Sequence, residues 1–233
     1  DKDTQRAYNE NKKTYNTRCK FAREFHVPDD KKFIFVLLHA FNDHPHSHYG
    51  KMIFKDYYDW FLRTLNFART KSDVTWVFKE HPTAAYYPTY DMSLADHFTP
   101  CPEHIVFIDK DTSFNSKSLL ILADAVVTVA GTAGMEFAAA NGIPSIIAGR
   151  AIYSGFGFTI EPKSRTEYFR VLSEIENLDR LTQEQQDIAR KVFLYNQRYS
   201  YCPFEWSPLF VWEETRDPAL GDYYWERVAR AYR

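Results

Sequence analysis

Apolar residues gather along the chain in short unbroken runs, and longer amphipathic stretches separate these runs. The unbroken runs predict buried strands over residues 33–38, 73–78, 104–109, 125–130 and 145–148. Runs of this length without polar alternation are typical of parallel strands that are covered on both faces. Apolar residues at helical spacing predict helices over residues 54–68, 119–123, 135–140, 164–175 and 181–199. This alternation indicates an α/β fold, a Rossmann-like open parallel sheet with helices on both faces and further helices at the C-terminal end.

The same pattern divides the chain into three parts. Residues 1–32 are mostly polar and predict a surface helix or a connector. Residues 33–178 hold all the predicted strands and form the expected nucleotide-sugar-binding domain, and residues 179–233 predict a helical tail that packs on it. With 233 residues, of which 45% are hydrophobic, the chain is long enough to bury a substantial core.

Charge and hydropathy narrow the range of partners. The chain has 29 basic and 31 acidic residues, and this balance gives no general attraction to nucleic acid or to anionic membranes. No apolar run approaches the ~20 residues that span a bilayer, so no transmembrane segment is expected, and the polar start of the chain does not resemble a signal peptide. Because the chain begins with Asp1 rather than Met, we expect it to be either trimmed at its start or a fragment of a longer chain.

The cysteines indicate the compartment. Cys19, Cys101 and Cys202 are odd in number, lie far apart and form no CxxC pair. Free thiols in a reducing environment fit this spacing better than disulfides or a zinc site. We therefore expect a cytoplasmic protein, either free or peripherally associated with the inner face of the membrane.

The stretch from Ala123 to Gly149 predicts a strand, a tight turn, a helix and a second strand. The turn is the small-residue sequence Gly131-Thr132-Ala133-Gly134. Small residues let a ligand approach the backbone, and the free amides and positive dipole end of the helix favour a phosphate group. Glu136, in the first turn of the helix, can reach the two hydroxyls of a ribose. The alternative is that the small residues only allow the helix to pack closely on the sheet.

The second predicted strand delivers Lys79, His81 and Pro82 at its carboxyl end. Lys79 and His81 are two residues apart on an extended chain and so point to the same side. A cation and an imidazole aimed together suit a departing phosphate, with Lys79 as a charge and His81 as a hydrogen-bond donor or general acid. The alternative is a strand end that carries merely solvated polar residues; we favour the functional interpretation because the first strand ends in a second polar loop at the same edge.

The first predicted strand runs into a loop that holds four of the eight histidines. His39 and Asp43 lie nearest the strand end, where open α/β sheets bind ligands, and we expect acid–base or phosphate chemistry from them. The alternating His44, His46 and His48, together with Asp43, offer a metal site as the alternative. A proline interrupts this segment and no outer partner for the ligands is recognisable, so we predict neither a metal nor a cofactor.

Four motifs follow one another along the chain. They are Lys79-x-His81-Pro82, Ala130-Gly131-Thr132-Ala133-Gly134-Met135-Glu136, Gly142-Ile143-Pro144, and the nonapeptide AIYSGFGFT from Ala151 to Thr159. In this order and spacing they resemble the nucleotide-binding half of GT-B glycosyltransferases of bacterial surface polysaccharides, capsule and lipopolysaccharide. Within these enzymes the likeness is to the capsule-polysaccharide biosynthesis group, which includes β-Kdo transferases that use CMP-Kdo. The likeness covers residues 33–172.

The resemblance implies roles for the matching residues. Lys79 and His81 would contact the donor phosphate and help the nucleotide to leave. The turn Gly131-Thr132-Ala133-Gly134 would hold the phosphate through its amides and the Thr132 hydroxyl, and Glu136 would bind the ribose.

The loop after the last strand also matches, and one position departs from the pattern. Tyr153, Gly155 and Gly157 would form a loop near the donor sugar. Related enzymes often have a Ser-Ser pair where this chain has Gly131-Thr132, and this departure leaves the nucleotide open.

The resemblance also implies what lies beyond this chain. GT-B enzymes bind the acceptor on a second Rossmann-like domain, and only one such domain fits here. The implied function is a metal-independent glycosyltransferase, or its donor-binding half, that transfers a sugar from a nucleotide-activated donor such as CMP-Kdo to a glycan acceptor, with Asp43 as the candidate base. The alternatives are a nucleotide-sugar 2-epimerase, which turns over without an acceptor, and a non-catalytic nucleotide-binding or assembly module, which does not turn over.

Overall fold

The computed structural model of the protein describes residues 11–42, 51–82, 84, 93–198 and 230. The chain divides into two units, residues 1–193 and residues 194–233. The first unit contains every strand described below. The structure describes two parts of the second unit, residue 230 and residues 194–198, which end the helix Gln183–Arg198.

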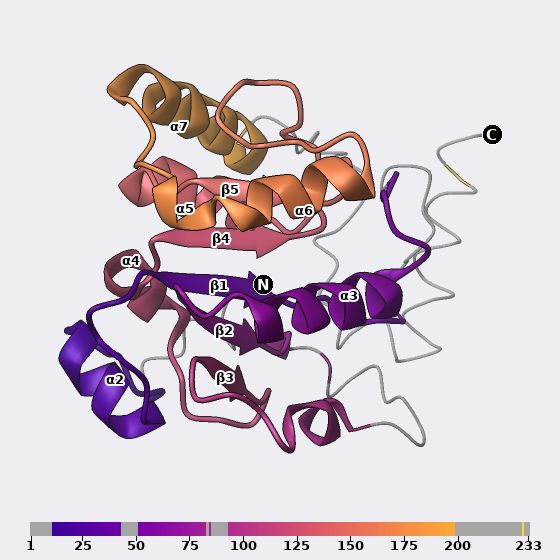
Figure 1. The fold of residues 1–233 in the computed structure, drawn as a ribbon. Coiled ribbons are helices and arrows are strands. Elements are labelled where there is room, and N and C mark those ends of the chain that lie inside the picture. Colours follow the sequence, from indigo (N-terminus) through magenta and orange to yellow (C-terminus); the bar gives the residue numbers. More distant parts are fainter. Residues whose placement is uncertain (1–10, 43–50, 83, 85–92, 199–229, 231–233) are drawn as a thin grey trace. The chain divides into compact units, whose positions relative to one another are not determined.

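One parallel sheet organises the first unit. Its strands are β1 (Phe33–Leu37), β2 (Thr75–Lys79), β3 (Ile105–Ile108), β4 (Ala125–Thr128) and β5 (Ser145–Ile147). They lie in the order β3-β2-β1-β4-β5, and every neighbouring pair is parallel (Figure 1). The order of the strands reverses between β1 and β4, and open α/β sheets bind ligands at the carboxyl ends of strands beside such a reversal. The predicted Rossmann-like sheet is confirmed.

Helices follow the strands as the pattern predicts, with shifted ends. They are α2 (Arg18–Phe25), α3 (Tyr57–Thr70), α4 (Leu119–Leu122), α5 (Ala133–Asn141), α6 (Arg165–Ser173), α7 (Gln183–Arg198) and the 3-10 helices η2 (Leu94–Phe98), η3 (Ser116–Ser118) and η4 (Ile175–Asn177). α3 begins three residues later than residue 54 because Asp56 caps it, accepting a hydrogen bond from the Asp59 amide at 2.7 Å. Ser164 caps α6 in the same way, accepting a hydrogen bond from the Glu167 amide at 3.1 Å.

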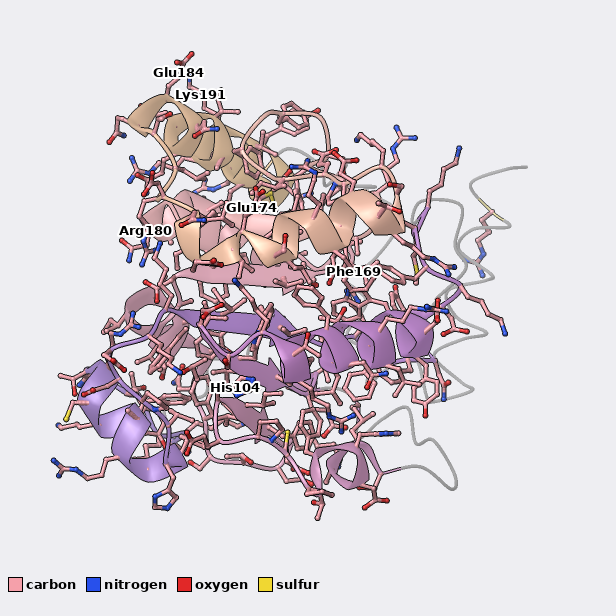
Figure 2. All side chains as sticks on the ribbon, in the orientation of Figure 1. His104, Phe169, Glu174, Arg180, Glu184 and Lys191 are labelled. Carbon is pink, nitrogen blue, oxygen red and sulfur yellow. The ribbon has the colours of Figure 1, made fainter. Side chains whose placement is uncertain are left out.

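Two apolar layers cover the two faces of the sheet. On one face, α3 and α6 cover the sheet, and they lie side by side in front of it in Figure 1. Phe169 of α6 packs against Phe67 of α3 with their ring centroids 5.4 Å apart, and Figure 2 labels Phe169 on α6. On the other face, α2, α4 and Phe137 of α5 cover the sheet.

Some predicted features fall elsewhere or outside the described residues. Between β2 and β3, residues 94–98 form η2, although the sequence pattern predicts no helix there. Asp43, His44, His46 and His48 lie outside the described residues, as do residues 199–229 and 231–233 of the predicted helical tail. Within the described part of the chain, none of the helices combines the length and the apolar character that crossing a bilayer requires.

Candidate functional site at the carboxyl edge of the sheet

The strand register brings the ends of β2, β1 and β4 to one level. Leu37 of β1 pairs with Lys79 of β2, and the Leu38 amide donates to the Lys79 carbonyl at 3.0 Å. On the other side of β1, the Thr128 hydroxyl donates to the Leu37 carbonyl at 3.3 Å. The residues that follow these strands therefore leave the sheet at the same edge, although they are far apart in the sequence.

The side chain of His39 bridges the ends of β1 and β4. The Ala130 amide donates to His39 Nε2 at 3.4 Å, and Thr128 Oγ1 lies 3.1 Å from the same atom. Because a backbone N–H can only donate, Nε2 is the acceptor and the ring proton sits on Nδ1. Burial, and secondarily the nearby His81, lower the pKa of His39 to about 3. His39 is therefore uncharged at neutral pH, and it lies close enough to His81 to be affected by its charge.

The surroundings of Lys79 disfavour its charged form. Burial and the neighbouring Lys12 lower the pKa of Lys79 to about 8, although Glu80 opposes this shift. Lys79 follows Val77 by two residues in β2, so both side chains leave the same face of the sheet. Val77 packs in the layer that contains Phe137 of α5, so Lys79 emerges on the face that α5 covers.

The turn that opens α5 leaves two amides available. The Gly134 amide donates to the Gly131 carbonyl at 3.1 Å, and the amides of Met135 and Glu136 both donate to the Thr132 carbonyl at 2.9 Å. The hydroxyl of Thr132 does not cap the helix. The amides of Thr132 and Ala133 donate to no other residue that the structure describes. This start of a nine-residue helix therefore offers donors and a positive dipole end to an anion.

Tyr153 locks the loop after β5 onto this turn. Its hydroxyl donates to the Gly131 carbonyl at 2.5 Å. A Cβ on Gly134 would lie 2.4 Å from the Tyr153 hydroxyl oxygen and 3.1 Å from Cζ, so a glycine is needed there for close approach. Burial first, and then the charges of Glu136 and Glu161, raise the pKa of Tyr153, so the hydroxyl keeps the proton that it donates.

The two glycines of the loop after β5 adopt left-handed backbone conformations, which favour glycine. Gly155 has φ of 86° and Gly157 has φ of 83°. Glu161 Oε1 accepts hydrogen bonds from the Gly155 amide at 2.7 Å and from the Thr159 hydroxyl at 3.0 Å. Gln185 Nε2 donates to the Gly157 carbonyl at 3.1 Å. These hydrogen bonds therefore fix the shape of the loop that contains Tyr153, Gly155 and Gly157.

Most of the residues singled out from the sequence thus come together. His39, Lys79, His81, the turn and the Tyr153 loop share the carboxyl edge of the sheet, and the effect of Glu136 on the pKa of Tyr153 puts that carboxylate near the loop. Asp43 cannot be placed, since it lies outside the described residues. Sequence reasoning missed Thr128, for which the available signal was a hydroxyl at the end of an otherwise apolar strand.

Several solved structures are similar at low identity. KpsC, the β-Kdo 2,7 transferase of Thermosulfurimonas dismutans, is 19% identical with a TM-score of 0.44, over 76% of this chain and 53% of that chain. The wall teichoic acid polymerase TagF is 14% identical with a TM-score of 0.45, over 78% and 42%. The UDP-GlcNAc 2-epimerase of Methanocaldococcus jannaschii is 12% identical with a TM-score of 0.45, over 78% and 49%. This chain spans about half the length of these proteins.

Family membership comes from the sequence itself. No curated protein matches the chain. A family model described as "Capsule polysaccharide biosynthesis protein" matches residues 6–188, which include all five strands and every residue of the edge described above. The resemblance stated from the motifs is thereby confirmed, and the chain belongs to the capsule polysaccharide biosynthesis protein family.

Proposed function

We propose that this chain is the donor-binding part of a glycosyltransferase that builds a bacterial capsular or related surface polysaccharide. The observation that carries the proposal is the position of His39, whose Nε2 accepts from the Ala130 amide while its pKa responds to His81. This arrangement supports a single site assembled from the ends of β1, β2 and β4. Membership of the capsule polysaccharide family supports the polysaccharide context.

In this proposal the residues at the carboxyl edge of the sheet bind the phosphate of a nucleotide sugar. Lys79 supplies a positive charge, His81 donates a hydrogen bond or a proton, and the turn supplies the amides of Thr132 and Ala133. The Thr132 hydroxyl, which does not cap the helix, is a further donor. Glu136 accepts from the ribose hydroxyls, and the Tyr153, Gly155 and Gly157 loop borders the donor sugar.

The reaction exchanges one bond at the anomeric carbon for another. The oxygen of an acceptor hydroxyl forms a bond to this carbon, the bond to the donor phosphate oxygen breaks, and its electron pair stays on the phosphate. Lys79, His81 and the helix amides stabilise that charge in place of a metal ion. The acceptor proton passes to a base, for which Asp43 is our candidate, and the acceptor is bound by a domain outside this chain. We propose a CMP-linked, Kdo-like sugar as the first donor to test, at the cytoplasmic side of the membrane.

His39 has a different part from His81. Its Nε2 lone pair is already taken by the Ala130 amide, and its pKa of about 3 keeps it neutral. We therefore assign His39 to positioning the turn and His81 to the contact with phosphate.

Calorimetric titration with CMP, CDP, UDP and GDP tests the proposal. We expect one of these nucleotides to bind the wild-type chain, and His81→Asn and Lys79→Gln to weaken that binding at least ~10-fold, as loss of a charge-assisted hydrogen bond predicts. His26→Asn, an exposed histidine at the end of α2, is the matched control and should bind like the wild type. If no nucleotide binds, or if His81→Asn and Lys79→Gln bind as tightly as the control, the proposed site is wrong.

A further inference from the structure

The segment that precedes α2 runs beside the residues that follow β3. The Lys13 amide donates to the Ser113 hydroxyl at 3.2 Å, and the Lys13 carbonyl accepts from the Asn115 amide at 2.9 Å. Two residues later, the Tyr15 amide donates to the Ser118 hydroxyl at 3.0 Å. The two segments therefore run in the same direction, and the residue before Lys13 lies towards the carboxyl end of β3.

This segment packs into the apolar layer that lies under the candidate phosphate site. Tyr15 is buried, and its ring stacks on Phe114 with the ring centroids 5.7 Å apart. Both rings belong to the layer that contains Val77 of β2, and Ala133 of the turn that opens α5 packs against the same layer. Because Lys79 leaves the sheet on this face, the chain before Tyr15 reaches the carboxyl edge on the side where Lys79 emerges.

Lys12 brings a second ammonium group to this edge. After burial, its charge is the main cause that lowers the pKa of Lys79, so the two side chains act on each other. Glu80 opposes this effect, but its Oε2 is engaged after β3, where it accepts from the Lys110 amide at 3.0 Å and lies 4.0 Å from Lys110 Nζ. Among the residues that the structure describes, neither Lys12 nor Lys79 forms an ion pair with a carboxylate. Two cations therefore share this edge, and neither is paired with an anion there.

We propose that Lys12 is a further phosphate-binding residue of the donor site, contributed by the segment before α2 and not by a strand end. The inference rests on the proposed function. Like charges that are held near each other repel, and a phosphate bound beside both removes this repulsion and accepts a charge-assisted hydrogen bond from each ammonium group. The flexible stem of a lysine lets Lys12 reach a phosphate oxygen without a fixed geometry.

Calorimetric titration of the 233-residue chain with CMP, CDP and inorganic pyrophosphate at pH 7 tests this role. We expect Lys12→Gln to weaken the binding of those ligands that the wild type binds at least ~5-fold, as loss of a charge-assisted hydrogen bond predicts. Lys12→Arg keeps the charge and should retain most of the affinity. The matched control is Lys13→Gln, which removes the same charge one residue away, from an exposed ammonium group that pairs with Glu24. This control should bind like the wild type.

The pH dependence of binding separates a phosphate contact from a merely structural role. Loss of the Lys12 charge raises the pKa of Lys79, so Lys79 stays protonated to a higher pH in Lys12→Gln. The variant should therefore bind more weakly than the wild type at pH 7, yet lose its remaining affinity at a higher pH. A change that only loosened the segment would weaken binding without moving this midpoint.

Acetylation of Lys79, followed by mass spectrometry in the absence of nucleotide, tests the proximity of the two lysines. Because only the unprotonated amine reacts, the pH midpoint of labelling should rise in Lys12→Gln and stay unchanged in Lys13→Gln. The inference is overturned if this midpoint does not move, or if Lys12→Gln binds the ligands as tightly as Lys13→Gln. It fails alone when Lys79→Gln still weakens nucleotide binding, whereas a wild type that binds none of the ligands overturns the proposed function as well.

Discussion

The imidazole of His39 stacks face to face on the ring of Tyr57, with the ring centroids 4.4 Å apart and the planes 3° from parallel. Tyr57 is the first residue of α3, and Trp60 meets the same imidazole edge-on at 6.3 Å. The helix therefore sets the plane of the ring, while the Ala130 amide fixes its rotation from the side of β4. The Ala130 amide also occupies the lone pair of Nε2, the atom that would have to take up a proton, so the ring is held in its neutral form.

We expect acid to destabilise the protein partly through His39. The pKa is about 3 in the folded chain and near 6.5 in the unfolded chain, so the unfolded state binds more protons between these values. The contribution of His39 to stability is complete above pH 6.5 and is lost as the pH falls towards 3, at up to about 1.4 kcal/mol per pH unit. Urea unfolding of the wild type and of His39→Gln, measured from pH 7 to pH 4, checks this. The free energy of unfolding should fall less steeply with falling pH in the variant than in the wild type.

The exposed His26 provides the comparison for this experiment. His26→Asn keeps a residue that tolerates the left-handed conformation at that position, where φ is 54°. Its unfolding free energy should follow the wild-type curve with pH. Equal slopes for the wild type and His39→Gln would show that the imidazole is not held neutral by the fold.

Nucleotide binding should weaken as the pH rises through the pKa of Lys79. Burial and Lys12 lower that pKa to about 8, so the ammonium loses its proton and its attraction for phosphate above this pH. We expect the affinity of the nucleotide found by titration to fall at least ~3-fold between pH 7 and pH 9.5. Lys79→Arg keeps its charge over this range and should flatten the profile. A flat wild-type profile would argue against a phosphate contact by Lys79.

Adding a methyl group at Gly134 should displace Tyr153. The new Cβ would lie 2.4 Å from the Tyr153 hydroxyl oxygen, and overpacking of this kind costs ~1–3 kcal/mol of unfolding free energy. Tyr153→Phe removes this nearest atom, so Gly134→Ala should lower the free energy of unfolding by less in that background. A double-mutant cycle followed by urea unfolding measures the difference. Gly155→Ala, whose Cβ would meet no atom within 4 Å, should show no such coupling to Tyr153→Phe. A cost that is equal in both backgrounds would rule out the hydroxyl as the obstacle.

Tyr168→Phe should lower the free energy of unfolding, because it removes a buried hydroxyl that is hydrogen-bonded. The Tyr168 hydroxyl accepts from Trp60 Nε1 at 2.9 Å and lies 2.9 Å from the Thr64 hydroxyl, and all three side chains are buried. Removing it leaves two polar groups without partners, which predicts a loss of ~1–3 kcal/mol of unfolding free energy. Tyr58→Phe, which loses one half-buried contact of 3.3 Å to His97, should cost less. Adding Thr64→Val to Tyr168→Phe should recover part of the loss, and no recovery would contradict this account.

The sheet could be predicted because buried parallel strands have a plain signature. Each run of apolar residues became a strand, and the shared direction of the strands placed the polar residues after β1, β2 and β4 at one edge. The ends were harder to predict. β4 stops at Thr128 although apolar residues continue to Ala130, because the Ala130 amide turns to His39 rather than to a neighbouring strand.

The side-chain chemistry of the site was less accessible to sequence reasoning. The partners of His39 come from α3 and from beyond β4, and no spacing pattern connects residues 39, 57 and 130. Lys51, Arg150 and Lys163 line one cavity of about 410 Å³, and they belong to three segments that only the fold brings together. Local patterns predict elements and their direction, whereas such contacts depend on how the elements pack.

The hydrogen bond from Tyr153 to the Gly131 carbonyl joins the loop after β5 to the turn that opens α5. Glu161 holds the same loop through the Gly155 amide. Any displacement of the turn must therefore break the Tyr153 hydrogen bond or carry the loop with it, so the two segments respond to a ligand as one piece.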